Sequence, residues 1–476
     1  MSYSDLCYLS AAEAIHQFKA RTLSPVELMQ AQIDRIDEIG APVNAFSFLY
    51  TEEALAAAKT AETAYAPGGT PRPLEGVPLA AKDENSIEGK ITTYGSLIYK
   101  DNVATSTTPV LQRLMDGGAI VHGRTTTPEF SCEAFCHSRL WGVTRNPWNL
   151  DFTPGGSSGG SGAALAGGMT TLATGSDIGG SIRIPASASG LVGYKPPYGR
   201  NPATPPFSMD FYNHPGPMAR TVEDCMLMQN LMSGPHPHDI VSLREKLELQ
   251  VDRSGVKGWK IAWSVDLGFY QVDPEVQRNT LAALQVFSDL GATVEEVDLG
   301  WTMETQDAAD AYLSTLFGAW VAEYLDERED LLTEYCKSFG HHSQTVTSKT
   351  YLESLNTAGR MYDRFGPLME DYNLFICPTL AIPAAGAEHD VRQEMKINGV
   401  PVHPRHGWIM TYPFNMLSRC PVLSVPSGRA SNGVPTGIQL VGRTYSDADV
   451  FKAGFAYEQA VGGWFTKPAD RPMVKG

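Results

Sequence analysis

The chain has 476 residues, of which 42% are hydrophobic and 19% are charged, proportions typical of a globular protein with a large core. Its 37 Lys and Arg residues are outnumbered by 53 Asp and Glu residues, which gives a net charge of −16. Such an acidic surface repels nucleic acid and anionic membranes, so we expect neither as a partner.

The N-terminal sequence has no basic segment followed by an apolar one, and no apolar run approaches the roughly 20 residues of a membrane span. Seven cysteines are scattered along the chain without a CxxC pair. This pattern is typical of reduced thiols in a cytoplasmic protein, so we expect that location.

Helical signals dominate the N-terminal part. Ser24 can cap a helix that starts at Pro25, and Glu27 can complete a capping box with it. An alanine-rich stretch, Glu52–Tyr65, predicts a second helix.

The next stretch predicts strands alternating with a helix. Val77–Ala81 is typical of a short buried strand, and Lys82 follows at its carboxyl end, where open α/β sheets place their chemistry. On this segment alone, a lysine that leaves the sheet for solvent is the commoner outcome. A helix over Thr108–Asp116 and a strand over Ala119–Val121 come next.

The segment Thr153–Gly193 is dense in glycine, serine and alanine, yet it contains apolar runs such as Ala163–Ala166. A flexible linker lacks such runs, so we expect this segment to be packed in the core. The proline-rich stretch Lys195–Pro217 follows and is predicted to be irregular. It is long for a structureless loop, which favours a segment that covers a site.

The second half alternates strands and helices, which favours an α/β fold. Predicted strands are Lys260–Trp263, Ala292–Val297, Leu374–Thr379, Val422–Pro426 and Gly437–Gly442. Predicted helices are Asp273–Leu290, Ser446–Val461 and a largely helical region, Met303–Arg364, with an interruption near residues 340–342.

Two glycine-flanked serine clusters carry the candidate chemistry, Gly155–Ser161 and Gly175–Ser181. Ser181 follows two glycines, and backbone N–H groups in such a turn can converge on an anion. A serine there could attack a carbonyl while those N–H groups hold the oxyanion. Glycines that only permit close packing explain the composition equally well.

A serine nucleophile needs a base, and no histidine lies near these clusters in the sequence. Lys82 is the candidate, provided that burial or a positive neighbour lowers its pKa far below about 10.4. Ser157 or Ser158 could relay the proton. A phosphate-binding loop is disfavoured because neither cluster ends in Gly-Lys-Ser/Thr, and a Gly-x-Ser-x-Gly elbow around Ser181 is absent.

Metal or cofactor binding is not indicated by the sequence. His236-Pro237-His238-Asp239 and His341-His342 are short histidine-rich matches, which more often lie on surface loops than bind metal. Cys132 and Cys136 lack zinc-knuckle spacing and are expected to be core or pocket-wall thiols. We therefore expect no cofactor and no metal.

These motifs resemble those of the amidase signature family of serine hydrolases. The serine-rich runs Gly155–Ser161 and Gly175–Ser187 match the family's two signature runs, and Gly76–Asp83 matches its lysine motif. Further matches over Gly142–Trp148, Pro413–Asn415 and Gly437–Gly442 extend the resemblance to nearly the whole chain. A departure follows the nucleophile, where Pro197 stands in place of a frequent threonine.

The resemblance implies a Ser-Ser-Lys triad, in which Lys82 is the base, Ser157 the relay in a cis peptide and Ser181 the nucleophile. It also implies an oxyanion hole and supporting residues. The implied oxyanion donors are the N–H groups of Ile178, Gly179, Gly180 and Ser181, and the supporting residues are Ser158, Asp177 and Arg183.

The implied fold is α/β, a single α/β/α domain with a central mixed twisted sheet flanked by helices. Residues 1–65 are expected to form a helical segment packed on the core, and residues 66–476 the amidase signature domain.

The expected activity is that of a stand-alone amidase on aryl or bulky amides, with carbamates (urethanes) and esters as related substrates. The expected partner is thus a small-molecule amide or carbamate, and a homodimer is compatible with the sequence. The alternative is an amidotransferase A-type subunit that works with a partner protein to release ammonia from glutamine. A binding protein without catalysis is disfavoured because Lys82, Ser157 and Ser181 are all present.

Overall fold

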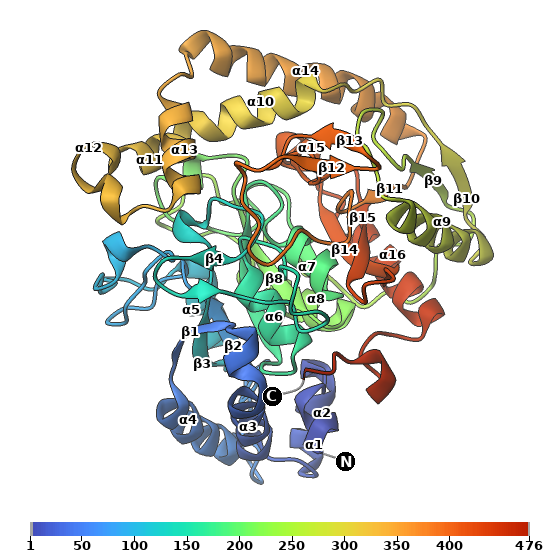
Figure 1. Cartoon of the computed structure of the whole chain (residues 1–476). Helices are drawn as coiled ribbons and strands as arrows, with labels where there is room; N and C mark the ends of the chain where they lie inside the picture. Colours follow the sequence, from blue (N-terminus) through green and yellow to red (C-terminus); the bar gives the residue numbers. More distant parts are fainter. Residues whose placement is uncertain (1–2, 475–476) are drawn as a thin grey trace.

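An 11-stranded mixed sheet runs through the middle of the computed structural model, which describes residues 3–474. The strand order is β1-β3-β2-β6-β8-β7-β14-β15-β11-β9-β10, and helices flank the sheet (Figure 1). The prediction of an α/β fold with a central mixed sheet flanked by helices is therefore confirmed.

The elements alternate along most of the chain. The strands are β1 (Phe46–Leu49), β2 (Pro78–Lys82), β3 (Ile120–Thr125), β4 (His137–Ser138), β5 (Gly142–Val143), β6 (Leu172–Asp177), β7 (Val192–Lys195), β8 (His214–Ala219), β9 (Lys260–Trp263), β10 (Thr293–Glu296), β11 (Leu374–Pro378), β12 (Met395–Ile397), β13 (Val400–Val402), β14 (Val422–Arg429) and β15 (Pro435–Val441). The α-helices are α1 (Tyr3–Cys7), α2 (Ala11–Ala20), α3 (Pro25–Val43), α4 (Thr51–Ala64), α5 (Pro109–Asp116), α6 (Gly159–Ala166), α7 (Arg183–Ser189), α8 (Val222–Met232), α9 (Pro274–Asp289), α10 (Glu304–Leu313), α11 (Ala319–Ala322), α12 (Leu325–Arg328), α13 (Glu334–Ser343), α14 (Ser348–Glu370), α15 (Tyr412–Met416) and α16 (Asp447–Val461). Short turns of other helix types are η1 (Leu97–Tyr99), η2 (Glu129–Ser131), η3 (Phe207–Met209), η4 (Ser314–Gly318), η5 (Glu329–Leu331) and η6 (Pro468–Asp470).

The parallel part of the sheet positions the candidate base. Strand β2 pairs in parallel with β3 on one side and with β6 on the other, so the carboxyl ends of all three strands meet at one edge. Lys82 is the last residue of β2, and its backbone N–H donates to Thr174 Oγ1 of β6 at 3.0 Å. This edge is where an open α/β sheet presents its chemistry.

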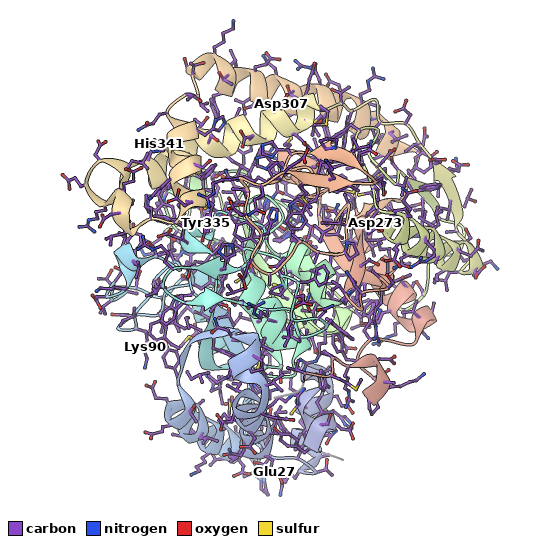
Figure 2. The ribbon with its side chains drawn as sticks, in the orientation of Figure 1. Glu27, Lys90, Asp273, Asp307, Tyr335 and His341 are labelled. Carbon is purple, nitrogen blue, oxygen red and sulfur yellow. The ribbon has the colours of Figure 1, made fainter. Side chains whose placement is uncertain are left out.

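The predicted start of α3 is confirmed. Ser24 Oγ accepts from the N–H of Val26 at 3.0 Å, and Glu27 Oε2 accepts from the N–H of Ser24 at 2.8 Å. Glu27 lies at the outer end of this helix in Figure 2. Strand β1 then joins the sheet through antiparallel pairing with β3. The domain boundary predicted between residues 65 and 66 stays a prediction.

The prediction of an irregular Lys195–Pro217 stretch is wrong at its end, because His214–Ala219 forms strand β8 between β6 and β7. Proline cannot donate to a ladder, which is why Pro215 and Pro217 favour a loop in the sequence. Pairing of β8 with β7 is confined to Met218 and Ala219. Pro215 and Pro217 lie in the part of β8 that does not pair with β7, so their missing N–H groups cost no hydrogen bond to that strand.

The predicted interruption near residues 340–342 is found a few residues further along the chain. Residues 340–342 belong to the last turn of α13, and the break lies between Ser343 and Ser348, where α13 ends and α14 begins. The helical run is also interrupted earlier, near η5. A Cβ on Gly340 would lie 3.2 Å from Leu325 Cδ1, so this glycine lets α13 pack closely against the preceding helices. On the same helix, Tyr335 is buried whereas His341 is exposed at the periphery and contacts Glu329 at 3.2 Å (Figure 2).

Among residues 3–474, every helix is too short or too polar to cross a bilayer.

Helix α6 depends on close backbone contact. A Cβ on Gly160 would lie 2.4 Å from the backbone N of Thr126 and 2.6 Å from its carbonyl oxygen, so only glycine fits there. Gly359 in α14 is the opposite case, because a Cβ there would meet nothing within 4 Å.

We expect Gly160→Ala to lower the free energy of unfolding by about 1–3 kcal/mol, because the methyl group would push α6 away from Thr126. The matched Gly359→Ala variant should instead gain about 0.5–1 kcal/mol from its helix propensity. Urea unfolding followed by tryptophan fluorescence measures both changes. Equal stability of the two variants would contradict the close-packing argument.

Candidate active site

Three segments bring the predicted triad residues together. Lys82 ends β2, Ser157 and Ser158 lie just before α6, and Ser181 lies in the turn between β6 and α7. Lys82 is fully buried, and Ser157 and Ser181 are almost so. The peptide bond between Gly156 and Ser157 is cis, as the resemblance implies.

The Lys82 ammonium nitrogen has three polar neighbours. It lies 2.7 Å from Ser157 Oγ, 2.8 Å from Ser176 Oγ and 3.0 Å from Glu84 Oε2. Burial lowers the pKa of Lys82, while the Glu84 carboxylate opposes part of that shift. Lys82 Nζ and Ser157 Oγ are thus within hydrogen-bonding distance, as the predicted proton relay requires.

Ser181 is linked to the relay segment through the backbone. The N–H of Ser158 donates to the carbonyl of Ser181 at 3.2 Å, and Ser158 Oγ accepts from the N–H of Ser176 at 3.4 Å. Within residues 3–474, the hydroxyls of Ser157 and Ser181 do not hydrogen-bond each other directly. Catalytic hydrogen bonds are often long without substrate and tighten in the reacting complex.

The turn before Ser181 presents free backbone donors. Within the described chain, the N–H groups of Ile178, Gly179 and Ser181 have no hydrogen-bond acceptor, whereas that of Gly180 donates to Asp177 Oδ1 at 2.9 Å. Gly180 has φ +123, and a Cβ there would lie 2.0 Å from Thr411 Oγ1, so glycine is required. Of the four predicted oxyanion donors, three therefore have no acceptor within the described residues and are free to bind an oxyanion.

A buried ion pair holds this turn in shape. Arg183 Nε and Nη2 donate to the two Asp177 oxygens at 2.8 Å each, and both side chains are fully buried. Burial raises the pKa of Asp177, but the Arg183 guanidinium and the Asn415 amide outweigh it, so the pKa lies below its ordinary value.

The same guanidinium reaches the C-terminal part of the chain. Its remaining bonds go to Thr411 O at 3.0 Å, Asn415 Oδ1 at 2.6 Å and Gln439 Oε1 at 2.6 Å. Asp177 and Arg183 are thus brought together where the sequence predicts supporting residues.

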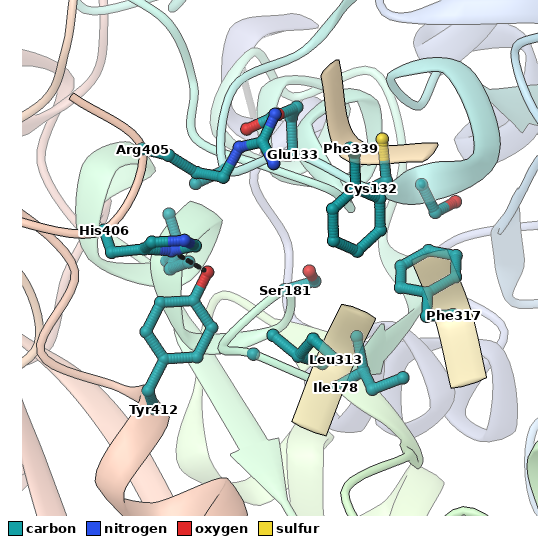
Figure 3. Close-up of a pocket in the computed structure, with 14 residues that line it drawn as sticks. Cys132, Glu133, Ile178, Ser181, Leu313, Phe317, Phe339, Arg405, His406 and Tyr412 are labelled. Atoms are coloured by element: carbon teal, nitrogen blue, oxygen red, sulfur yellow. Dashed lines mark hydrogen bonds and ion pairs between the residues drawn. The ribbon is translucent and has the colours of Figure 1, made fainter. Parts of the chain in front are cut away.

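Ser181 opens into a small pocket, here called the nucleophile pocket, with a volume of about 30 Å³. Figure 3 shows Ser181 facing it, between Tyr412 and His406 on one side and Phe317 and Phe339 on the other. Its other lining residues are Ser131, Cys132, Glu133, Ala134, Ile178, Gly179, Ile184, Leu313 and Arg405.

Ser157 opens into a larger neighbouring pocket, here called the relay pocket, with a volume of about 490 Å³. Ser131, Ile178 and Phe317 line both pockets, so the two chambers share a wall. The aromatic lining of the relay pocket is Tyr94, Phe130, Phe207, Phe317 and Trp320. Trp320 contacts Phe130 and Phe207 with ring centroids 4.7 Å and 5.4 Å apart.

The stretch 201–217 contributes to both the site and the core. Phe207 lines the relay pocket, whereas Tyr212 is buried and stacks on Tyr312 with ring centroids 3.6 Å apart. Cys132 lines the nucleophile pocket and Cys136 is buried, as predicted for pocket-wall and core thiols.

Sequence reasoning missed Ser176 and Glu84. Both contact Lys82, and both also line the relay pocket. The available signal is their position, since Ser176 precedes Asp177 in the second glycine cluster and Glu84 follows Lys82 by two residues. As for metals, residues 3–474 contain no group of three His, Cys, Asp or Glu side chains arranged to hold an ion.

A comparison with known families agrees with this geometry. A family model described as Amidase matches residues 27–451. The chain belongs to the amidase signature family. It is 34% identical to an acylamidase of Rhodococcus erythropolis, with 100% of each chain covered. It is also 33% identical to the A-type subunit of a glutamyl-tRNA(Gln) amidotransferase of Lachnospira eligens, with 95% of this chain and 98% of that one covered.

A solved structure supports the same assignment. A bacterial aryl acylamidase of the amidase signature family matches with a TM-score of 0.89 and 30% identity, covering 95% of this chain and 96% of that one. As a member of the amidase signature family with an acylamidase relative, the protein is an amide-hydrolysing enzyme.

We expect Arg183→Met to lower the free energy of unfolding of this amidase by about 3–5 kcal/mol, because it leaves the buried Asp177 carboxylate unpaired. Arg253→Met breaks the exposed pair with Glu223, whose atoms are 2.7 Å apart, and should cost no more than about 1 kcal/mol. Urea unfolding compares the two.

The double variant Asp177→Asn/Arg183→Met should be less destabilised than the sum of its single variants, because it removes both charges. An Arg183→Met variant as stable as Arg253→Met would contradict the buried-pair argument.

Proposed function

We propose that the protein is a stand-alone amidase that hydrolyses linear carboxylic amides through an acyl-enzyme on Ser181. The observation that carries the proposal is the 2.7 Å contact between Lys82 Nζ and Ser157 Oγ, buried beside a serine that faces a pocket. Carbamates (urethanes) and esters present a similar carbonyl carbon, so they belong to the proposed substrate range.

Acylation begins with the neutral Lys82 amine. It accepts the hydroxyl proton of Ser157, which accepts that of Ser181, and Ser181 Oγ bonds to the carbonyl carbon. The tetrahedral intermediate collapses when its C–N bond breaks, and the relay returns the proton from Lys82 through Ser157 to the leaving nitrogen. The acyl group is then an ester of Ser181.

Deacylation runs the same relay with water. Ser157 and Lys82 take a proton from the water as its oxygen bonds to the acyl carbon, and the proton then returns to Ser181 Oγ as the ester bond breaks. In both steps the negative oxygen would accept from the free N–H groups of Ile178, Gly179 and Ser181.

The two pockets support a division of the substrate. Ser157 must reach the leaving nitrogen to protonate it, so the amine side of the substrate belongs in the relay pocket. That pocket has a volume of about 490 Å³ and aromatic walls, which suits an aryl or bulky amine. The acyl side belongs beside Ser181, where about 30 Å³ suits a short acyl group.

The second candidate is an amidotransferase A-type subunit, favoured by the 33% identity to that component of a glutamyl-tRNA(Gln) amidotransferase. Glutamine would have to place its charged amino-acid end on the acyl side. The small nucleophile pocket argues against this, as does Arg405, whose guanidinium is held by the buried Glu133 carboxylate at 2.8 Å. A stand-alone enzyme therefore fits better.

We expect Ser181→Ala and Lys82→Met each to lower kcat/KM for acetanilide on the order of 10⁴-fold, because each removes an essential group of one relay. The purified chain alone should hydrolyse acetanilide without a partner. Lys90→Met, which removes a half-buried lysine away from the site that contacts Glu53 at 2.6 Å, should leave the rate unchanged.

Labelling by phenylmethanesulfonyl fluoride gives a second measurement. The label should map to Ser181 by mass spectrometry and should be strongly slowed in Lys82→Met. Full turnover in either triad variant would contradict the assignment of the triad. Activity on glutamine alone that depends on a partner protein would favour the amidotransferase.

We expect the enzyme to discriminate more strongly against large acyl groups than against large amine groups. Acetanilide should be hydrolysed with a kcat/KM at least about 10-fold above that of hexanoylanilide, because each extra methylene has no room beside Ser181. Trp320→Ala should reduce kcat/KM for acetanilide more than for acetamide, which leaves the aromatic wall untouched. Steady-state kinetics on this series tests both statements, and the reverse order would show that the pockets are assigned the wrong way round.

A further inference from the structure

Glu84 occupies an unusual place beside the candidate base. Its Oε2 lies 3.0 Å from Lys82 Nζ, and the side chain is 16% exposed whereas that of Lys82 is completely buried. Glu84 also lines the relay pocket. The mechanism above requires a neutral lysine, yet the nearest ionised group is a carboxylate that stabilises the charged form.

The contacts of Lys82 suit both of its protonation states. An ammonium has three N–H donors, and Ser157 Oγ, Ser176 Oγ and Glu84 Oε2 supply three acceptors. A neutral amine keeps two donors, for Ser176 and Glu84, and its lone pair can accept from the Ser157 hydroxyl. Only hydroxyl hydrogens need to turn, so the heavy atoms can stay in place when the proton leaves.

The other charged groups near Lys82 are already engaged. Asp177 is paired with Arg183 at 2.8 Å, and Asp83 is paired with Arg124 at 3.1 Å. A further titratable neighbour of Lys82 is Cys136, a buried thiol whose pKa is raised by burial. Glu84 is therefore the carboxylate that acts directly on Lys82.

The surroundings of Glu84 keep it ionised. Burial raises the pKa of this carboxyl, but Lys82 and the hydroxyls of Ser176 and Ser131 outweigh that, so the pKa lies below its ordinary value. Tyr94, which also faces Glu84, has a raised pKa and stays neutral. The charge next to Lys82 thus persists across the neutral range.

We propose that Glu84 is a positioning residue that sets the pH at which Lys82 becomes available as the base. The proposal rests on the proposed function, because it assumes that Lys82 acts on Ser157. Two opposing influences act on the lysine: burial favours the neutral amine, and Glu84 favours the ammonium. The enzyme therefore gains its neutral base at a higher pH than burial alone would give.

Glu84→Gln should make Lys82 available as the base at a lower pH. The amide keeps the size of the side chain and can still accept a hydrogen bond, but it removes the negative charge. The Lys82 ammonium then loses its partner, the proton leaves at lower pH, and the acidic limb of the pH profile of kcat/KM moves to lower pH. An opposite charge at this distance shifts a pKa by about 1–3 units, so we expect a shift of at least about one pH unit.

The matched control is Glu53→Gln, which removes the carboxylate of a surface pair with Lys90 at 2.6 Å. Its acidic limb should coincide with that of the unmodified enzyme. Glu84→Asp keeps the charge with a shorter reach, so its limb should lie between those of the unmodified enzyme and Glu84→Gln. A limb that stays in place or moves to higher pH in Glu84→Gln would overturn the proposal.

Labelling of Ser181 by phenylmethanesulfonyl fluoride separates this proposal from the proposed function. The rate of labelling depends on the same base but not on amide turnover, so its pH profile should shift in Glu84→Gln in the same direction. A shifted labelling profile without hydrolysis of any amide or carbamate would retain the role of Glu84 and reject the amidase. An unshifted labelling profile, with amide hydrolysis intact, would reject the role of Glu84 alone.

Discussion

The structure depends on the complete burial of an amine at the end of a strand. Lys82 can act as a base only if its surroundings make the charged form costly, and the core achieves this by closing β2, α6 and the turn before α7 around it. Closure demands very short side chains, which is why glycine and serine are so dense here. The hydroxyls of Ser157 and Ser176 then serve as the hydrogen-bond partners that make a buried lysine tolerable.

A second buried lysine shows how specific that arrangement is. Lys195 at the end of β7 is also fully buried, and burial lowers its pKa to about 7. Its nitrogen donates to backbone carbonyls, the closest being Cys420 O at 2.9 Å. Carbonyl oxygens can accept but never supply a proton, so Lys195 is held in place structurally. Burial alone does not make a lysine a base, because the base also needs a hydroxyl within reach.

The central part of this design is readable from the sequence because it is local. The short apolar run before Lys82 locates β2, and the two glycine-serine clusters mark the segment around Ser157 and Ser181, with little help from distant contacts. The assignment of Lys82, Ser157 and Ser181 to a triad comes from the resemblance to the amidase signature family. Glu84 was missed because a glutamate after a buried strand resembles any solvent-facing residue. Strand β8 was missed because its two prolines oppose strand structure locally, and only the short pairing with β7 permits it. Contacts such as Glu133 with Arg405 join residues hundreds of positions apart and leave no local signal.

The bonds of Arg183 to Thr411, Asn415 and Gln439 have a consequence for the newly made protein. The triad residues all emerge from the ribosome early, but the groups that fix the turn around Ser181 are made near the end of synthesis. A chain released before that point carries the reactive side chains without the frame that orients them. We therefore expect a chain that ends before Thr411 to be inactive, because Arg183 then lacks all three of these partners.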